Sequence, residues 1–412
     1  MQFLLELAGE ESQRITGLIQ EDQMRSKSQS NEAAAPQKKG KAGKIILTVV
    51  AILLGLAVGI GGFVYWYAKR LIVDNVTFVT NAAPTMIDEA GNTVDLEAVR
   101  QTTYYEPIDT ADDIHNFLLI GIDSRSRNYN ETGTGGLSDV TMVMSVNSTT
   151  GTIRLISIAR DCYVHVPGYS YAMKINAAMS RGGPDVLCAT VEDTLRINID
   201  GWAYVNFYHM AEIIDAVGGV YCDVSSSELN SEGGLNWNLA EVNNLMGLPA
   251  SQDAVTNTGY IWLNGRQAVA YARIRKVDSD YKRSERQVEV LRSLMDQFIN
   301  LSLTGKLAAM DDILGAITTN IPYDSIEDYA INFLPSVSNI SIEYMQLPIE
   351  GCFYSGMYGD EWSIRPNWNA MIPYVQEFFY GETTDFDPVP DISSSPSLDS
   401  CPSDLDINDL LK

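Results

Sequence analysis

The 412-residue sequence has few of the side chains that bind zinc or carry redox chemistry. It contains three His and five Cys, and none of them stand at metal-ligand or Cys-x-x-Cys spacing. The motifs Gly-x-x-x-x-Gly-Lys-Ser/Thr, Gly-x-Ser-x-Gly and His-Glu-x-x-His are missing as well. These absences leave the common ATPase, hydrolase and metalloprotease classes without support.

Positive charge is also scarce. The chain has 28 Lys and Arg against 53 Asp and Glu, which gives a net charge of −25. Basic charge supplies most of the affinity of proteins for a phosphate backbone, so no nucleic-acid partner is expected. The hydrophobic share of 45% nevertheless excludes a wholly disordered chain.

One long apolar segment is present. Ile45 to Tyr67 contains 23 residues without a charge and ends in Tyr65-Trp66-Tyr67, a length and an aromatic end typical of a membrane helix. Six basic residues lie in the 20 positions before it and two in the 20 after it. The sequence therefore predicts a single-pass membrane protein with a cytoplasmic N-terminus. A cleaved signal peptide fits less well, because the run is too long and lacks a small-x-small site.

Composition divides the chain into five predicted segments. The last of them is rich in Pro, Ser and Asp and is predicted to be disordered, while residues 226–258, rich in Ser, Asn and Glu, are predicted to leave the core. The five are a cytoplasmic segment 1–44, a transmembrane helix 45–67, an extracellular spacer 68–112, a folded domain 113–383 and an acidic tail 384–412.

Within the folded domain, short apolar runs alternate with amphipathic stretches. This alternation predicts an α/β sheet covered by helices on both faces. Gly218-Gly219 is read as a helix stop. After Arg283, apolar residues recur at the spacing of one buried helix face. The predicted strands start near Phe117, Met142, Ile153, Trp202 and Val220, and the predicted helices near Asp185, His209 and Arg283.

Two carboxylates follow or precede predicted strands. Asp123 and Arg125 come at the carboxyl end of the 117–122 strand, where open α/β sheets bind ligands. Ser138-Asp139 stands before the next strand, in a glycine-rich loop. Asp123 and Asp139 can together hold Mg²⁺. The alternatives are a polar turn and an ordinary strand start.

Basic residues form two further clusters. Arg160-Asp161 follows the 153–158 strand, with Lys174 further along, and a surface salt bridge is the alternative. If 271–275 is extended, Arg273 and Arg275 share one face. Arginine binds phosphate oxygens in bidentate fashion, although a solvated basic helix face is the other possibility. Three more residues share a helix face at i, i+3, i+4 spacing, namely Arg283, Arg286 and Gln287.

Together the clusters describe a site for a metal-bound pyrophosphate, and their order along the chain resembles the LytR-CpsA-Psr family of bacterial envelopes. The resemblance covers roughly Asn116 to Arg292, with weaker similarity on to Gly381. It rests on Leu118-Leu-Ile-Gly-Ile-Asp123, Ser138-Asp139, Ile156-Ser-Ile-Ala-Arg160-Asp161, Lys174-Ile-Asn-Ala-Ala178, Asp215-Ala-Val-Gly-Gly-Val220, Tyr271-Ala-Arg-Ile-Arg275 and Arg283-x-x-Arg286-Gln287.

The resemblance implies a central mixed sheet between helices, with an apolar tunnel for a polyprenyl chain. It also implies an extracellular phosphotransferase that moves a glycopolymer from a polyprenyl-pyrophosphate carrier to a cell-wall acceptor, usually a peptidoglycan muramic acid hydroxyl. Two alternatives remain. A non-catalytic protein with the same site would only bind the lipid-linked glycan. An enzyme that used water as the acceptor would be a phosphatase.

The resemblance also implies residue roles. Asp123 and Asp139 would hold Mg²⁺ (or Mn²⁺), and Asp139 or Asp161 would be the base. Leu137 departs from the family, which usually has Arg there, and Arg125 or Arg127 are candidate substitutes. The residues implied to bind the pyrophosphate are Arg160, Arg273, Arg275 and Gln287, with Lys174 nearby; Arg125, Asp161, Arg283 and Arg286 join them as candidate substrate-binding residues.

All five cysteines fall on the predicted outer side of the membrane, where disulfides persist. Cys162 and Cys188 are predicted to form one, with two separately buried thiols as the alternative. Cys222 is expected to be unpaired. Cys352 would reach Cys401 only if the acidic tail folded back, which its composition does not favour.

Overall fold

The computed structural model describes residues 70, 76–79, 83–103, 113–122, 136–277, 280–322, 325, 341–397, 401 and 410. The chain divides into two compact units, Met1–Ile72 and Val73–Lys412. Segment 1–44 and the predicted helix 45–67 lie outside the described residues. Within the described ranges, no helix combines the length and the apolar character that crossing a bilayer requires.

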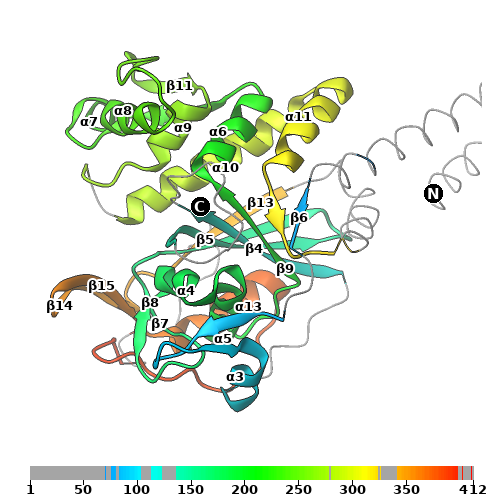
Figure 1. Ribbon diagram of the computed structural model, residues 1–412, viewed down its shortest axis with the longest axis vertical. Coiled ribbons are helices and arrows are strands. Elements are labelled where there is room, and N and C mark those ends of the chain that lie inside the picture. Colours follow the sequence, from blue (N-terminus) through cyan, green and yellow to red (C-terminus); the bar gives the residue numbers. More distant parts are fainter. Residues whose placement is uncertain are drawn as a thin grey trace, which may run out of the picture. The chain divides into compact units, whose positions relative to one another are not determined.

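The second unit is built on a mixed seven-stranded sheet (Figure 1). Its first three neighbouring pairs are parallel, antiparallel and parallel; the next two are antiparallel and the last is parallel. The predicted α/β fold with a mixed central sheet is confirmed. In spatial order the strands are β1 (Thr77–Phe78), β12 (Thr318–Thr319), β9 (Gly201–Asn206), β4 (Ile114–Ile122), β5 (Ser138–Asn147), β6 (Thr152–Ile158) and β13 (Ser341–Leu347).

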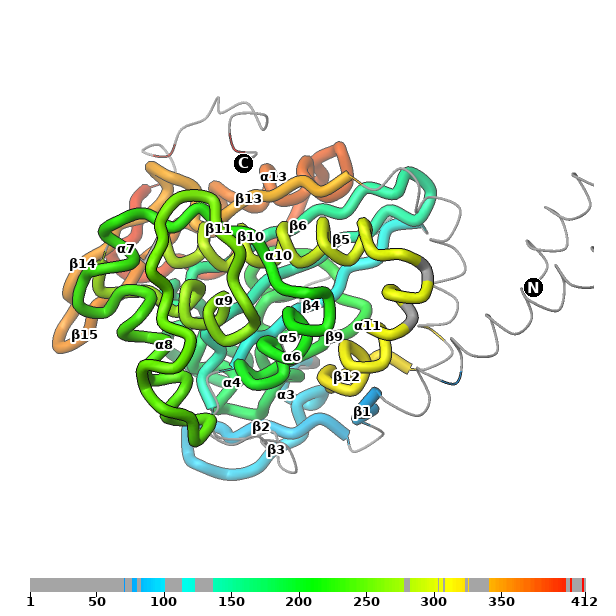
Figure 2. The backbone as a smooth tube through the Cα atoms, turned by 90° about the horizontal axis from the view of Figure 1, so that it is seen from above, coloured from blue at the N-terminus to red at the C-terminus, as the bar shows by residue number. Residues whose placement is uncertain are grey.

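Helices cover both faces of this sheet, as expected. Figure 2, seen from above, shows one helical layer in front of the strands. That layer contains α6 (Phe207–Ala216), α7 (Ser226–Asn230), α8 (Leu235–Leu245), α9 (Gly265–Ala272), α10 (Asp280–Asn300) and α11 (Leu303–Gly315). The opposite layer contains α3 (Leu96–Thr103), α4 (Ile175–Gly182), α5 (Pro184–Leu195) and α13 (Trp368–Tyr380).

Four two-stranded antiparallel sheets complete the described strands. These strands are not part of the central sheet, and two of the pairs border the site described below. They are β2 (Thr85–Ile87) with β3 (Thr93–Asp95), β7 (Tyr163–His165) with β8 (Ala172–Lys174), β10 (Val220–Val224) with β11 (Gly259–Leu263), and β14 (Phe353–Tyr358) with β15 (Glu361–Pro366).

Side-chain alternation along the central strands sends apolar groups to both layers. Leu118 and Val143 pack into the core that includes α5 and α13. Met142 instead packs toward α10, against Val288. Leu291 and Met295 join that cluster, so the predicted buried face of this helix is confirmed for these positions.

The Gly218-Gly219 pair ends α6 and turns the chain into β10. Both glycines have positive φ angles, 90° and 91°, which L-residues with side chains rarely adopt. A Cβ atom at Gly219 would also lie 2.3 Å from the indole nitrogen of Trp262. The predicted helix stop is confirmed.

Residues 226–258 form part of a second core, so their prediction as an excursion is wrong. The segment supplies α7 and α8, and Leu239 and Val242 are almost completely buried there. A capping box at Ser225 starts α7. The segment is mostly polar, but it contains a few apolar residues at helical spacing. These residues are enough to give α8 one buried face.

Both segments that flank the predicted folded domain contribute to its core. Met86 in β2 and Leu96 in α3 are buried, so 83–103 belongs to the domain rather than to a spacer. Residues 384–397 pack on α13, with Val389 and Ile392 buried. The predicted disordered tail is therefore wrong for this stretch, because its few apolar side chains find a preformed surface.

All five cysteines are free thiols in the structure, and Cys162 and Cys188 are not among each other's interacting groups, so the predicted Cys162–Cys188 disulfide is wrong. The backbone of Cys162 forms an isolated β-bridge with Ile364 of β15. Cys188 lies instead on α5, near the guanidinium of Arg100. The sequence separation suited a disulfide, and both side chains contact the same core, but each thiol has other neighbours than its predicted partner.

Candidate active site

Three parallel strands bring polar residues to one edge of the central sheet. Ile122, the last described residue of β4, pairs in register with Ser138 of β5 and with Asn206 of β9. Asp139 follows Ser138, and Arg160 comes shortly after the end of β6. The carboxyl ends of β4, β6 and β9 therefore meet here, which is where open α/β sheets bind ligands.

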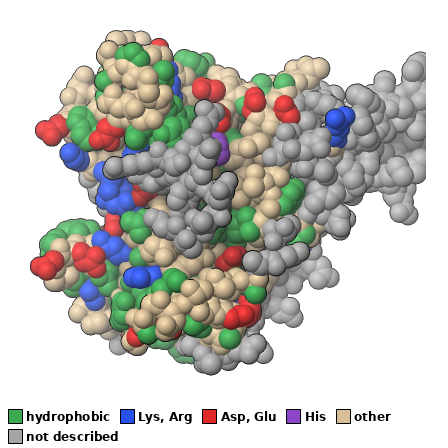
Figure 3. Space-filling model, in the orientation of Figure 1, with side chains coloured by type: hydrophobic (Ala, Val, Ile, Leu, Met, Phe, Trp, Pro, Cys, Tyr) green, Lys and Arg blue, Asp and Glu red, His purple; other side chains and the backbone are tan. Residues whose placement is uncertain are grey.

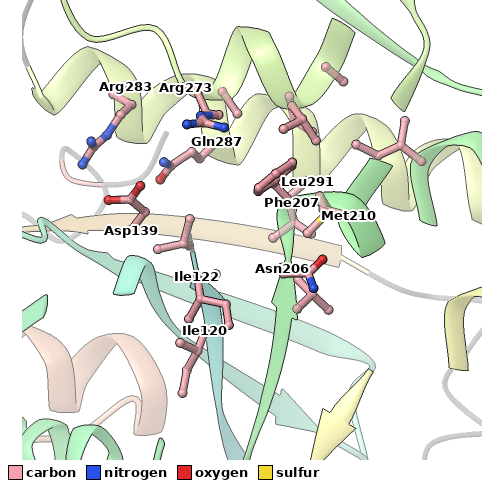
Figure 4. Close-up of a pocket in the computed structure, with 18 of the residues that line it drawn as sticks. Ile120, Ile122, Asp139, Asn206, Phe207, Met210, Arg273, Arg283, Gln287 and Leu291 are labelled. Atoms are coloured by element: carbon pink, nitrogen blue, oxygen red, sulfur yellow. The ribbon is translucent and has the colours of Figure 1, made fainter. Parts of the chain in front are cut away.

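A cavity of about 990 Å³ opens between the sheet and the helices α6, α9, α10 and α11. Figure 4 shows that its two ends differ in character: Asp139, Arg273, Arg283 and Gln287 lie together, and Phe207, Met210 and Leu291 lie toward the other end. Other polar lining residues are Arg160, Asn206, Asn238, Glu241, Arg275 and Lys276, and other apolar ones include Leu119, Met142, Ala203, Val205, Ile213, Val269, Val290, Leu294, Ile313 and Ile317.

Arg160 joins two of the predicted clusters. Its guanidinium forms an ion pair with Asp139 and a longer hydrogen bond of 3.4 Å with Asp161. The almost completely buried Asp161 also pairs with Lys174 at 3.0 Å, and Lys174 lies 3.6 Å from Glu361 in β15. Opposite charges thus alternate from the cavity to the β14–β15 hairpin.

Arg273 and Arg275 follow α9 rather than lying on an extended segment. Asn264 caps this helix and Gln267 closes a capping box, so the chain is helical to Ala272 and Arg273 keeps a helical conformation. The predicted extended geometry is wrong, yet both arginines line the cavity. The Arg273 guanidinium lies 5.4 Å above the Phe207 ring, a cation–π contact that orients it.

Arg283 and Gln287 line the cavity, whereas Arg286 faces a different partner. Its Nε lies 2.6 Å from Glu228 Oε1, and its Nη1 donates to the Ile274 carbonyl at 3.1 Å. The Arg286 side chain therefore supports the turn that presents Arg275. Asp123 and Arg125 lie outside the described residues.

Arg286→Ala is expected to lower the free energy of unfolding by about 3 kcal/mol, because it leaves the largely buried Glu228 carboxylate unpaired. Burial raises the pKa of Glu228, but hydrogen bonds from Ser225 and Arg286 outweigh it, so the pKa is lowered overall. The stabilisation is thus present above the carboxylate's ordinary pKa and is lost as pH falls through the lowered value. Urea unfolding at neutral and acidic pH measures both effects.

Lys282→Ala is the matched control, since Lys282 forms an exposed ion pair with Glu285 on the same helix. Such pairs contribute about 0–1 kcal/mol. An Arg286→Ala loss no larger than that of the control would contradict the role given to Arg286.

Two lining residues of α6 escaped the sequence analysis, whereas Leu137 had been noted there as a departure from the family. Leu137, in the position where arginine was expected, lines the cavity with its side chain 48% exposed. Phe207 and Met210 in α6 line it as well. Their i, i+3 spacing was available in the sequence, but it equally fits packing against a sheet.

Figure 3 shows basic side chains gathered on one face between the helical layer with α9 and the β14–β15 hairpin.

The described carboxylates include no cluster of three or more metal-ligating side chains. Mg²⁺ is commonly bound by one or two carboxylates and completed by substrate oxygens. Asp139 offers one such carboxylate at the polar end of the cavity. Ile122, which directly precedes Asp123 in the sequence, pairs with the neighbour of Asp139. The residues present fit an ion shared with a phosphorylated substrate.

A family model described as the LytR_cpsA_psr family matches residues 76–371, from β1 into α13. The chain belongs to this family. Segment 384–397, which packs on α13, lies beyond the LytR_cpsA_psr match.

Named relatives and a solved structure agree with the LytR_cpsA_psr assignment. The polyisoprenyl-teichoic acid–peptidoglycan teichoic acid transferase TagT of Bacillus subtilis is 32% identical over 61% of this chain and 72% of its own. A second transferase of the same description, TagU of Enterococcus faecalis, is 28% identical. The match covers 73% of this chain and 86% of TagU. The crystal structure of protein gbs0355 from Streptococcus agalactiae shares the fold, with a TM-score of 0.56, 21% identity and coverage of 72% and 94%.

Proposed function

We propose that this chain is an extracytoplasmic phosphotransferase that moves a glycopolymer from a polyprenyl-pyrophosphate carrier to a peptidoglycan acceptor. The carrier has a doubly charged headgroup on a long apolar chain. One cavity here joins a polar end with arginines to an apolar end of matching character, and this is the observation that carries the proposal. The names of the relatives, which describe polyisoprenyl-linked teichoic acid transfer to peptidoglycan, support it.

The residues at the polar end can position and neutralise the pyrophosphate. Arg160, Arg273 and Arg275 supply donors that match phosphate oxygens in bidentate fashion. Phosphoryl transfer depends mainly on in-line positioning and on stabilisation of charge at the transferring and leaving oxygens. Cavity walls of leucine, isoleucine, valine and phenylalanine would hold the prenyl chain and exclude water, which disfavours hydrolysis.

Asp139 would hold Mg²⁺ together with Asp123. When bound, the ion would neutralise charge on the phosphate oxygens. For the acceptor hydroxyl, Asp139 is better placed than Asp161 to accept a proton. Asp139 lines the cavity, whereas Asp161 is buried between Arg160 and Lys174.

The same proposal places the chain in the cell membrane with its folded domain outside. The apolar run 45–67, with more basic residues before it than after it, supports this orientation. The prenyl carrier lies in the same membrane, so anchoring keeps the domain close to its substrate. Protease digestion of intact spheroplasts should remove the folded domain and spare segment 1–44.

A transfer assay tests the function directly. The full-length protein in membranes is incubated with a labelled lipid-pyrophosphate glycan and a peptidoglycan fragment. Label joined to the peptidoglycan fragment supports a transferase. Free sugar phosphate would instead indicate a phosphatase, and retained substrate a non-catalytic binder. EDTA should stop the transfer and Mg²⁺ or Mn²⁺ should restore it.

Leu137→Arg is expected to lower the KM for the lipid-pyrophosphate substrate about tenfold. Leu137 lines the cavity at its polar end, where an added guanidinium can reach phosphate oxygens. A charge-assisted hydrogen bond contributes about 1.5–3 kcal/mol. Initial rates over a range of substrate concentrations give the KM, with Leu137→Met as the uncharged control. Equal KM values for the two variants would contradict the prediction.

A further inference from the structure

The C-terminal segment brings two cysteines together that are far apart in the sequence. Cys352 directly precedes β14, and Cys401 lies beyond the segment that packs on α13. Both belong to the same core, with exposures of 0% and 8%. The two thiols are near enough to influence each other's titration, and the Cys401 thiol also donates to the Ser397 carbonyl at 3.8 Å.

Specific hydrogen bonds hold the chain on both sides of this pair. The Asn367 backbone N–H donates to the Cys352 carbonyl at 2.9 Å, and the Asn367 side chain donates to the Pro396 carbonyl at 3.1 Å. Arg365 donates to the Ser393 carbonyl at 2.6 Å. One residue of the β15–α13 turn thus ties the Cys352 strand to the chain that leads to Cys401.

A second set of contacts anchors the segment to α13. Asn369 accepts from the Val389 backbone N–H at 2.7 Å and donates to the Val389 carbonyl at 2.8 Å. Gln376, also on α13, accepts from the Thr384 N–H at 2.8 Å. These hydrogen bonds hold the segment at Thr384, Val389 and Pro396. The fold of the chain therefore brings Cys401 close to Cys352.

We propose that Cys352 and Cys401, which are free thiols in this structure, form a disulfide on oxidation that fastens the C-terminal segment to the base of the β14–β15 hairpin. The proposal rests on the extracytoplasmic location given under the proposed function, since disulfides persist there. The hairpin carries Glu361, which pairs with Lys174 beside the cavity. Fixing the base of the hairpin therefore also limits how far Glu361 moves from the site.

The reaction needs a disulfide oxidant, either a small molecule such as oxidised glutathione or a protein disulfide. The Cys401 thiolate attacks one oxidant sulfur and releases one thiol of the oxidant. The Cys352 sulfur then attacks the mixed disulfide, and the second oxidant thiol leaves. Two protein thiols are oxidised to one disulfide, and the oxidant disulfide is reduced to two thiols.

Burial determines when this reaction takes place. It raises the pKa of the Cys352 thiol to about 12, and the neighbouring Cys401 adds to the effect. Since the thiolate is the reactive form, a folded and reduced protein should oxidise slowly. The bond is expected to form while the C-terminal segment is still docking.

Disulfide mapping of the full-length protein tests the proposal. Membranes are isolated with thiols blocked by N-ethylmaleimide at lysis, and the protein is cleaved after glutamate without reduction. Glu361, Glu377 and Glu382 lie between the two cysteines, whereas trypsin would leave both in one peptide because Arg365 is followed by Pro366. A peptide pair joined through Cys352 and Cys401, separated by reductant, is the expected result.

Thermal unfolding with and without reductant gives a second readout. Cys401→Ser should lower the melting temperature by about 5 °C more in oxidising buffer than in reducing buffer, as expected for loss of a long-loop disulfide. Cys352→Ser should behave alike. Cys222→Ser is the control, because Cys222 is buried in the other core and its replacement should have the same effect in both buffers.

N-ethylmaleimide found on both Cys352 and Cys401 in protein from membranes would overturn the proposal. The transfer assay on the same preparation separates this outcome from a failure of the proposed function. An intact bond without transfer would refute the function alone, and transfer with both thiols blocked would refute the disulfide alone.

Discussion

Asp139→Asn and Arg273→Ala are each expected to lower the rate of glycopolymer transfer by about 10²–10³-fold, the usual cost of removing one electrostatic stabiliser. Both side chains line the polar end of the cavity. Asp139→Asn keeps the shape of the side chain but removes the charge that pairs with Arg160. Arg273→Lys should also be impaired, because an ammonium cannot replace bidentate phosphate binding. Single-turnover assays with labelled lipid-pyrophosphate glycan measure the rates.

Arg266→Ala is the matched control for Arg273→Ala. Arg266 lies in α9, the helix that Arg273 directly follows, but its guanidinium pairs with Asp253 and Asn243 and does not line the cavity. This variant should keep the wild-type transfer rate. Near-wild-type rates for both Asp139→Asn and Arg273→Ala, in protein with unchanged thermal unfolding, would show that the cavity is not the active site.

Ala203→Phe is expected to reduce transfer from a long-chain polyprenyl carrier about 10²-fold. Ala203 lies on β9, pairs in register with Leu119, and lines the cavity. A phenyl ring there would occupy space needed by the prenyl chain. Losing the burial of about four methylene groups costs about 3 kcal/mol, which corresponds to roughly that factor in affinity. Rates with carriers of different prenyl length measure the effect.

Carrier length distinguishes a blocked cavity from general damage. A carrier shortened to a few isoprene units should be used equally well by Ala203→Phe and wild type. Ala203→Ser, which adds almost no volume, should retain transfer from both carriers. An equal loss with long and short carriers would mean that the apolar end does not hold the prenyl chain.

The local sequence patterns predicted the elements that position the site. Strand β10 occupies the predicted residues, and α10 buries the predicted face through Val288 and Leu291. Each of these patterns depends on neighbours within a few residues. The glycine pair after α6 acts through backbone geometry alone. The ordered motifs sufficed to indicate the LytR_cpsA_psr family, and the match over 76–371 confirms this.

The sequence analysis was wrong in one segment because a local helix signal was missed, and in another because distant contacts outweighed local composition. Residues 271–275 were judged by alternation, but the capping box at Asn264 carries the helix to Ala272. Segment 226–258 looked too polar for a core, yet its few apolar residues complete a face that β10 and α9 leave open.

By itself, the sequence determined the strands β4, β6 and β9 and the helices α6 and α10 around the cavity, because period and glycine stops act over one or two turns. Only the tertiary structure decided which distant side chains meet. Arg160, which follows β6, reaches Asp139 on the neighbouring strand β5, and Arg286 pairs with Glu228 instead of lining the cavity. In the same way, the acidic tail docks on α13 and places Cys401 beside Cys352. These encounters depend on complementary surfaces that exist only after the sheet and its helices have packed.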